Sequence, residues 1–438
     1  MTLPTTSASE SMQQEQPAQQ SNKPKQLQRK HDRLITRDMA LVMLATFCFM
    51  SSNMLANPIV AGYAESLGAS GMLMGVVAGS MSFISLFCRP IAGNLSDRTS
   101  KRTLVTAGTV LYFTAGLLYY FANSPIMLIM ARVINGVGFA CCSVCLATWM
   151  SLLLPIRHMG AGMGLYGTMN ALAMAVGPAL GIRAQKYIGY RLTFLSSLIL
   201  AAIMLIATLM VKNGGQPVRK KQPSTTENPS LAVDIDGSID GSAGATKKHH
   251  LSIRSILEPR VVPLSLTFMM FAIAYFANQS FIMNYVEARH LPVSADLFFM
   301  FYAVTLLVLR MVLRDLFDSK GFRSWLTLCS LGMLAMLACM TFLFNDWMLL
   351  LAAFFTAVGY GLMSSVTQAQ AVVIAGRERS GIANSTYYAG IDLGMSVGPF
   401  VGGLVYGRLP VVWFYPVFML TVPVAWLIYW LCVRRVSR

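Results

Sequence analysis

The chain alternates between long apolar runs and short polar breaks. Each run is long enough for an α-helix to cross a bilayer, which takes about 20 residues. Six runs precede a polar segment at about 212–260, and six follow it. Their approximate limits are 39–64, 71–94, 103–123, 126–150, 159–183, 191–211, 262–286, 294–314, 325–345, 347–373, 381–407 and 411–433. The pattern predicts an all-α integral membrane protein with 12 transmembrane helices in two six-helix bundles.

The two sets of six runs also predict the domain organisation. We expect a polar tail at 1–36, a first bundle at 37–211, a linker at 212–260, a second bundle at 261–433 and a short tail at 434–438. The first tail is rich in Gln, and the linker in Lys, Ser, Asp and Gly. Both are too polar to bury a core, so we predict that they are disordered.

Composition and charge agree with this interpretation. Hydrophobic residues make up 55% of the chain and charged residues only 12%, about half the usual charged share. A soluble enzyme and a nucleic-acid-binding module are therefore excluded. The net charge of +16 reflects orientation, because most of the 34 Lys and Arg residues fall on one side of the predicted membrane. We expect a multi-pass protein of the cell membrane with both termini in the cytoplasm and no nucleic-acid partner.

The sequence predicts no metal site, no cofactor and no enzymatic activity. Cys142 and Cys145 form a C-x-x-C pattern inside an apolar run, without a second cysteine pair or a histidine nearby. All 5 histidines lie outside the apolar runs, and no constellation of His, Ser or paired acids lies at depth. No nucleotide-binding loop occurs, so ATP does not drive the protein. The expected partners are a small-molecule substrate, protons and the lipid bilayer, and the expected state is a monomer.

The two halves repeat at a single offset of 221 positions. At this offset Arg89 matches Arg310, Asn57 matches Asn278, and Gly177-Pro178 matches Gly398-Pro399. Two halves of the same orientation are the parallel repeat of one class of secondary transporter, whose substrate site lies near the midplane.

With these motifs the chain resembles the major facilitator superfamily, from about Arg37 to Val433. The loop after the second helix carries the superfamily's signature, with Ser100 in place of the usual glycine; the matching residues are Gly93, Asp97, Arg98, Lys101 and Arg102. The fourth helix carries a second signature at Arg132, Gly136 and Gly138.

The fifth and eleventh helices carry the glycine-proline motif associated with proton-coupled exporters. In the fifth helix Ala173 and Ile182 replace two of its usual glycines. The motif residues are Gly164, Gly177, Pro178 and Gly181 in the fifth helix and Gly394, Gly398, Pro399, Gly402 and Gly403 in the eleventh. Within the superfamily the chain is similar to bacterial drug/proton antiporter-type efflux permeases.

The resemblance implies transport by alternating access, with a gating loop and a central cavity. The gating loop corresponds to the signature after the second helix and would engage helix 11; a plain solvated turn is the alternative. The cavity would be lined by helices 1, 4, 7 and 10, which carry the candidates Asn53, Asn57, Tyr275, Asn278 and Gln279. Gln368 and Gln370 in helix 10 are weaker candidates, because they lie nearer the inner end.

Helix 11 has two different faces. One is a polar stripe at four-residue spacing, formed by Asn384, Tyr388, Asp392 and Ser396. The other is a stripe of Gly394, Gly398 and Gly402 at the same spacing, about 200° around the helix. We expect the glycine face to let another helix approach closely, and a role in bending is equally open.

Asp392 is the main candidate for proton coupling. It lies near the middle of its predicted helix, and an intramembrane carboxylate is costly enough to suggest a function. The alternative is a structural ion pair with Arg132 or Arg310. Arg132 is a second coupling candidate by resemblance, with hydrogen bonding to carbonyl groups as the alternative. Arg89 and Arg310 lie near helix ends, where long side chains reach water, so we expect structural roles for them.

These observations favour proton-coupled efflux of a small molecule. Proton-coupled uptake of a sugar or other metabolite is the alternative on the same fold. A non-transporting membrane sensor is a weaker third hypothesis.

Overall fold

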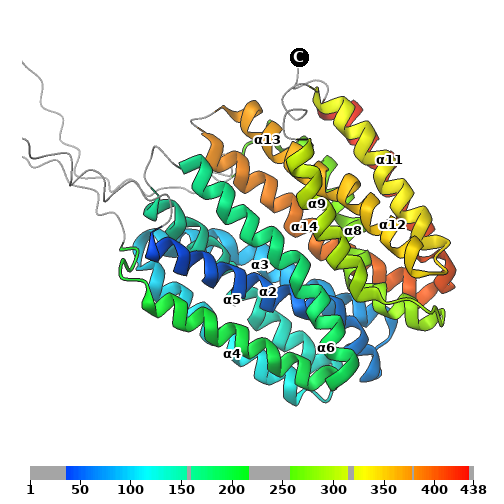
Figure 1. The fold of residues 1–438 in the computed structure, drawn as a ribbon, viewed down its shortest axis with the longest axis horizontal. Helices are drawn as coiled ribbons and strands as arrows, with labels where there is room; N and C mark the ends of the chain where they lie inside the picture. The colour runs from blue at the N-terminus through cyan, green and yellow to red at the C-terminus, as the bar shows by residue number, and fades with distance from the viewer. Residues whose placement is uncertain (1–35, 155–158, 217–256, 314–319, 377–378, 434–438) are drawn as a thin grey trace, which may run out of the picture. The chain divides into compact units, whose positions relative to one another are not determined.

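The computed structural model describes residues 36–154, 159–216, 257–313, 320–376 and 379–433, apart from the side chains at 97, 159–161, 164, 175, 380 and 381. This part of the chain is helical and contains no strand (Figure 1). The first half consists of α2 (Arg37–Ser66), α3 (Gly71–Arg98), α4 (Lys101–Phe121), α5 (Pro125–Leu153) and α6 (Met159–Met210). The second half consists of α8 (Val262–Ala288), α9 (Ala295–Val312), α11 (Phe322–Thr341), α12 (Asp346–Thr356), α13 (Met363–Ala375), α14 (Ser380–Arg408), α15 (Phe414–Phe418) and α16 (Thr421–Ile428).

Within the described residues, 11 helical stretches are long and apolar enough to cross a membrane. One of them, in α6, is 46 residues long, more than twice what a bilayer core of about 30 Å accommodates. It contains two helices joined at Gly189, whose φ of 74° suits glycine. The tenth crossing is α12 and α13 joined by a π-helical turn at Ala357–Leu362. The predicted all-α fold with 12 crossings is thus confirmed.

The sequence repeat is also a repeat of packing. In the first half α2 packs on α6, and in the second half α8 packs on α14, its counterpart at the 221-residue offset. Both contacts require glycine, because a side chain would clash with the neighbouring helix. A Cβ at Gly177 would lie 2.7 Å from the Met54 Cβ, and one at Gly398 would lie 2.5 Å from the Ile273 oxygen. Between the halves, α3 packs on α14 and α6 packs on α9, which are again equivalent under the offset.

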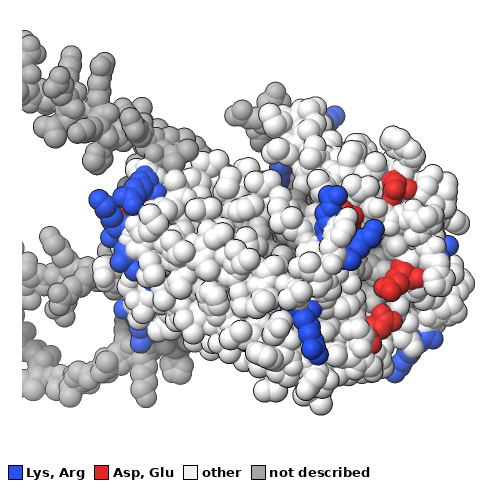
Figure 2. Space-filling view, turned by 60° about the horizontal axis from the view of Figure 1, so that its bottom comes forward, with Lys and Arg blue, Asp and Glu red and all other residues white. Residues whose placement is uncertain are grey.

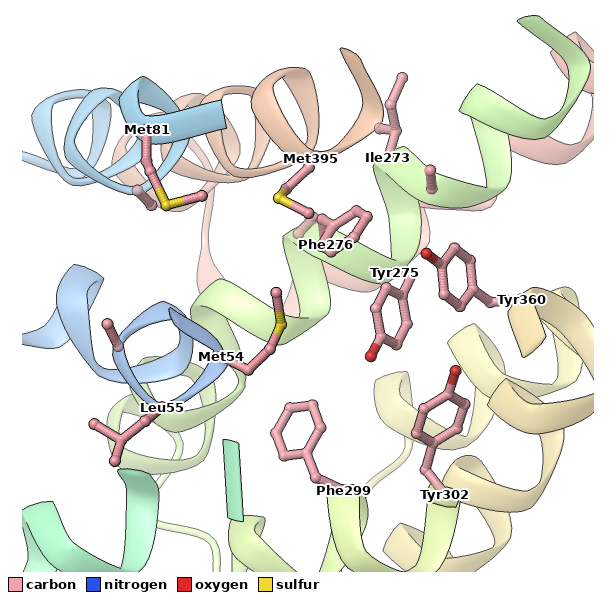
Figure 3. Packing of buried hydrophobic residues seen from close by; sticks show 14 of the residues in the cluster. Met54, Leu55, Met81, Ile273, Tyr275, Phe276, Phe299, Tyr302, Tyr360 and Met395 are labelled. Atoms are coloured by element: carbon pink, nitrogen blue, oxygen red, sulfur yellow. The ribbon is translucent and has the colours of Figure 1, made fainter. Parts of the chain in front are cut away.

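Large apolar side chains cover the outside of the helices, while both polar and apolar groups fill the interior. Phe87, Ile91 and Ile126 are among the exposed apolar residues. The face drawn in Figure 2 is largely uncharged between a group of basic residues at one end and mixed charges at the other. The buried core near the middle includes Met54 of α2, Met81 of α3 and Met395 of α14, close to the aromatic residues of α8 and α9 (Figure 3).

The "Arg37 side" is the end at which α2 begins and α3 ends, and the "Ser66 side" is the end at which α2 ends and α3 begins.

Candidate transport pathway

An ion pair between Arg89 of α3 and Asp392 of α14 joins the two halves. The Arg89 Nε lies 2.6 Å from the Asp392 Oδ2, and the Arg89 Nη2 donates a hydrogen bond of 2.9 Å to the Asp392 Oδ1. The carboxylate is 3% exposed, whereas the arginine side chain is 23% exposed. The guanidinium also lies 5.5 Å from the centre of the Phe139 ring.

This partner differs from the expected one. The sequence suggested Arg132 or Arg310 as a structural partner for Asp392 and an outward-reaching Arg89. In the structure α3 runs along α14, and the Arg89 side chain extends to Asp392 instead. Side chains on a helix lean towards its N-terminus, which for Arg89 is the direction of Asp392 rather than of the helix end.

The polar stripe of α14 continues from Asp392 towards the Arg37 side. Gln368 of α13 donates from its Nε2 to the Asn384 Oδ1 at 3.3 Å and to the Tyr388 hydroxyl at 3.5 Å. Tyr388 is 44% exposed although it belongs to a membrane-spanning helix. Tyr166 of α6 lies within electrostatic reach of both Arg89 and Tyr388. Gln368, which the sequence ranked low, therefore belongs to this group, and so does Tyr166, which it missed.

The opposite face of α14 packs against α8 of the same half. A Cβ at Gly394 would meet the Ala272 Cβ, and one at Gly402 would lie 3.1 Å from the ring of Phe281. In the first half, Gly181 of α6 similarly faces the backbone oxygen of Leu55. Pro178 and Pro399 are both buried within their helices. Gly164 of the same motif lies outside the described side chains.

Arg132 is buried and bonded only to neutral acceptors. Its guanidinium donates to the Asn57 Oδ1 at 3.1 and 3.2 Å, to the Ala78 oxygen at 2.6 Å and to the Val77 oxygen at 3.2 Å. The structure places no described carboxylate on it. This geometry matches the carbonyl-bonded alternative from the sequence more closely than the proton-transfer one.

The predicted cavity residues of α2 and α8 are all buried, and two of them are turned into their own bundles. The Asn57 Oδ1 accepts hydrogen bonds from the Arg132 guanidinium, and the Asn278 Oδ1 accepts a hydrogen bond of 2.8 Å from the Tyr415 hydroxyl. In this conformation both amides are thus engaged within their own bundles, and their place in a shared cavity stays a prediction.

The remaining amides lie closer to the boundary between the halves. Gln279 of α8 contacts the Met54 sulphur across that boundary at 3.8 Å. Asn53 is fully buried, and neither of its side-chain polar atoms has a partner among the described residues. Since buried polar groups are normally hydrogen-bonded, Asn53 is the amide best suited to meet a ligand or water. The Tyr275 ring, which is also fully buried, stacks on Tyr360 with ring centres 4.0 Å apart (Figure 3).

The signature loop after α3 contacts the segment that follows α6. The Ser100 hydroxyl donates to the Gly214 oxygen at 2.7 Å, and the Arg102 guanidinium donates to the Val211 oxygen. The Lys101 ammonium donates to the Ser96 oxygen and is buried. These contacts tie the loop to its own half, and its engagement of helix 11 stays a prediction because the side chain of Asp97 lies outside the described part.

Arg98 and Gly93 of this signature make no such contacts with described residues. Arg98 is exposed and forms no ion pair with a described carboxylate. A side chain at Gly93 would meet nothing within 4 Å. The side chain of Asp97 lies outside the part that the structure describes.

On the Ser66 side the halves touch through backbone atoms and through Glu65. A Cβ at Gly71 would lie 2.5 Å from the Gly407 Cα, and one at Gly75 would lie 2.9 Å from the Gly403 Cα. The Glu65 carboxylate accepts hydrogen bonds from the Asn284 amide and, at 3.3 Å, from the Tyr406 hydroxyl. These contacts were not predicted from the sequence, although Gly71, Gly75 and Gly79 recur at a spacing that signals close helix packing.

A family model described as "Major Facilitator Superfamily" matches residues 42–345 and 302–438. The chain belongs to the major facilitator superfamily. Membership and fold together support secondary transport across a membrane.

The relatives and neighbours agree with this family. An uncharacterized MFS-type transporter of Methanocaldococcus jannaschii is 26% identical over 161 residues, which are 36% of this chain and 42% of that protein. An SPX domain-containing membrane protein of Arabidopsis thaliana is 33% identical over 169 residues, 37% of this chain and 24% of that protein. The matched regions thus span less than half of either relative.

Among solved structures, a POT family transporter in complex with 5-aminolevulinic acid superposes with a TM-score of 0.71 at 11% identity. The superposition covers 92% of this chain and 97% of that chain. At this identity the likeness supports the fold alone.

Proposed function

We propose that the protein is a proton-coupled antiporter that exports a small molecule, with the Arg89–Asp392 ion pair as its coupling element. The observation that carries the proposal is the position of this pair. Asp392 is the only carboxylate deep within the described helices, and its partner lies on the opposite half. A proton that binds Asp392 therefore removes a charge from the contact between the moving parts.

The energetic argument follows from the burial of the carboxylate. Removing one partner of a buried ion pair typically costs about 3–5 kcal/mol. A shift of about 5.5 kcal/mol is enough to invert a 1:99 equilibrium between two conformations. Protonation of Asp392 would weaken α3–α14 association by a comparable mechanism and favour separation of the halves on the Arg37 side.

The two sides of the molecule support this role. On the Ser66 side, backbone contacts at Gly71 and Gly75 and the hydrogen bonds of Glu65 hold the halves together. On the Arg37 side, Tyr388 and the Arg89 guanidinium retain exposure. With the Arg37 side placed in the cytoplasm, a cytoplasmic substrate reaches the pair in this conformation.

The test is proton movement in inside-out vesicles that contain the full-length protein, with a panel of dyes, drugs and sugars. We expect substrate-induced proton release from wild type and none from Asp392→Asn. Asp296→Asn, the same chemical change in the first turn of α9, is the matched control and keeps wild-type release. Equal proton release from wild type and Asp392→Asn refutes the coupling role, and a substrate that enters the cell with protons refutes the direction.

A further inference from the structure

The arginine that repeats Arg89 in the second half has no ion-pair partner among the described residues. Arg310 of α9 lies 221 positions after Arg89, and α9 packs on α6 as α3 packs on α14. The residue that corresponds to Asp392 in this second interface is Ala171 of α6. Both halves therefore carry the arginine at this position, but only the second half carries the carboxylate that pairs with it.

The surroundings of Arg310 do not replace that carboxylate. The structure gives its guanidinium no ion pair with any described residue, and its Nε is buried without a hydrogen-bond acceptor. The side chain as a whole is only partly buried. An arginine stays charged under all ordinary conditions, and buried donors are normally satisfied.

The Arg310 side chain lies within electrostatic range of three buried tyrosines. Arg310 interacts electrostatically with Tyr302, two turns back along α9, and with Tyr360 and Tyr387 of the neighbouring helices. Tyr302 and Tyr360 both lie beside Tyr275 in the aromatic cluster of Figure 3.

The charge balance of the described helices points the same way. Three arginines lie in the membrane-spanning helices, Arg89, Arg132 and, in the last turn of α9, Arg310, against the single deeply placed carboxylate of Asp392. Arg132 is fully bonded to neutral acceptors, and Arg89 is neutralised by Asp392. Only Arg310 is left to attract a mobile anion.

We propose that Arg310, beside Tyr302 and Tyr360, binds the negatively charged group of the transported substrate, a carboxylate or a phosphate. The guanidinium matches the geometry of both oxyanions, and phenol groups add hydrogen-bond donors and a flat apolar surface. This inference rests on the proposed transport function and names the substrate class, a small oxyanion.

The experiment uses the full-length protein in proteoliposomes with three labelled probes: inorganic phosphate, succinate and the cation tetraphenylphosphonium. We expect wild type to move phosphate or succinate, and Arg310→Gln to slow that flux about ten-fold or more. Arg310→Lys keeps part of the flux because it keeps the charge. Arg408→Gln, which removes an exposed arginine at the end of α14, is the matched control and keeps wild-type flux.

A second variant tests the inference without removing Arg310. Ala171→Asp would give Arg310 the carboxylate that Asp392 gives Arg89, and we expect it to abolish oxyanion flux without lowering the unfolding temperature. The proposal is overturned if neither oxyanion is transported, or if Arg310→Gln and Ala171→Asp both leave oxyanion flux unchanged. Oxyanion flux that needs Arg310 but moves no proton upholds this inference and refutes the coupling through Asp392. Proton-coupled flux of tetraphenylphosphonium without any oxyanion flux upholds the coupling through Asp392 and refutes the oxyanion inference.

Discussion

Replacing Gly403 by alanine should open the Ser66 side of the protein. A Cβ at this position would meet the Gly71 oxygen and would lie 2.6 Å from the Gly75 Cα, and both atoms belong to the backbone of the other half. Backbone atoms cannot rotate away, so α3 has to withdraw from α14 by about 1 Å. Overpacking of this kind costs about 1–3 kcal/mol, which corresponds to a population shift of about 5–150-fold towards conformations in which this contact is broken.

The neighbouring Gly402 provides the matched control. Its Cβ would lie 3.1 Å from the Phe281 ring and 3.6 Å from the Ala277 Cβ, and both residues belong to the same half. Gly402→Ala therefore tests the loss of a glycine on α14 without touching the boundary between the halves. A small rotation of the ring accommodates the methyl group.

Distances between spin labels measure the outcome. Labels at Ser66 and Leu409, both exposed on the Ser66 side, report the separation of the halves in a background without the native cysteines. We expect Gly403→Ala to add a longer distance to the distribution and Gly402→Ala to leave it as in wild type. An unchanged distribution in Gly403→Ala, in a protein that still folds, refutes the idea that this glycine contact holds the Ser66 side closed.

Three further variants test other contacts. Exchanging the charges of the coupling pair, Arg89→Asp with Asp392→Arg, should restore part of the thermal stability that each single variant loses, as measured by unfolding in detergent; no restoration would refute a direct pair. Arg132→Lys should lower stability by about 2 kcal/mol, because an ammonium cannot reproduce the forked contacts to Asn57 and the α3 carbonyls; wild-type stability would refute the structural role. Glu65→Ala should lengthen the distance between spin labels at Ser66 and Leu409, since it removes the carboxylate that Asn284 and Tyr406 contact; an unaltered distance would show that Glu65 does not contribute to closure.

The fold could be predicted from sequence because the membrane restricts the options. Apolar runs of sufficient length define crossings directly, and the offset of 221 residues predicts that the halves are built alike. The two faces of α14 also followed from helical periodicity alone, because residues four apart share a face. Only the identity of the helices on those faces, α8 and α3, required the structure.

The partners of the charged residues could not be predicted in the same way. Arg89 and Asp392 are 303 positions apart, and no local pattern relates them. From the sequence alone, Arg132 and Arg310 were equally plausible as partners of Asp392. Only the packing of α3 along α14 shows that Arg89 is the partner. The burial of Asn57 was predictable from the sequence. Its hydrogen bond from Arg132 was not, because it depends on how two helices are rotated about their axes.

The repeat preserves the helix packing of the two halves but only part of their buried charges. The offset preserves Arg89 and Arg310, but it matches Asp392 with Ala171 and Arg132 with Ala353. If rocking of the halves exchanges the roles of the α3–α14 and α6–α9 interfaces, a fully symmetric charge pattern would stabilise both conformations equally and couple to nothing. With one carboxylate, the first interface responds to a proton on Asp392. On the two proposals above, the second interface responds to an oxyanion on Arg310, so each ligand acts on the conformational equilibrium through the arginine of a different interface.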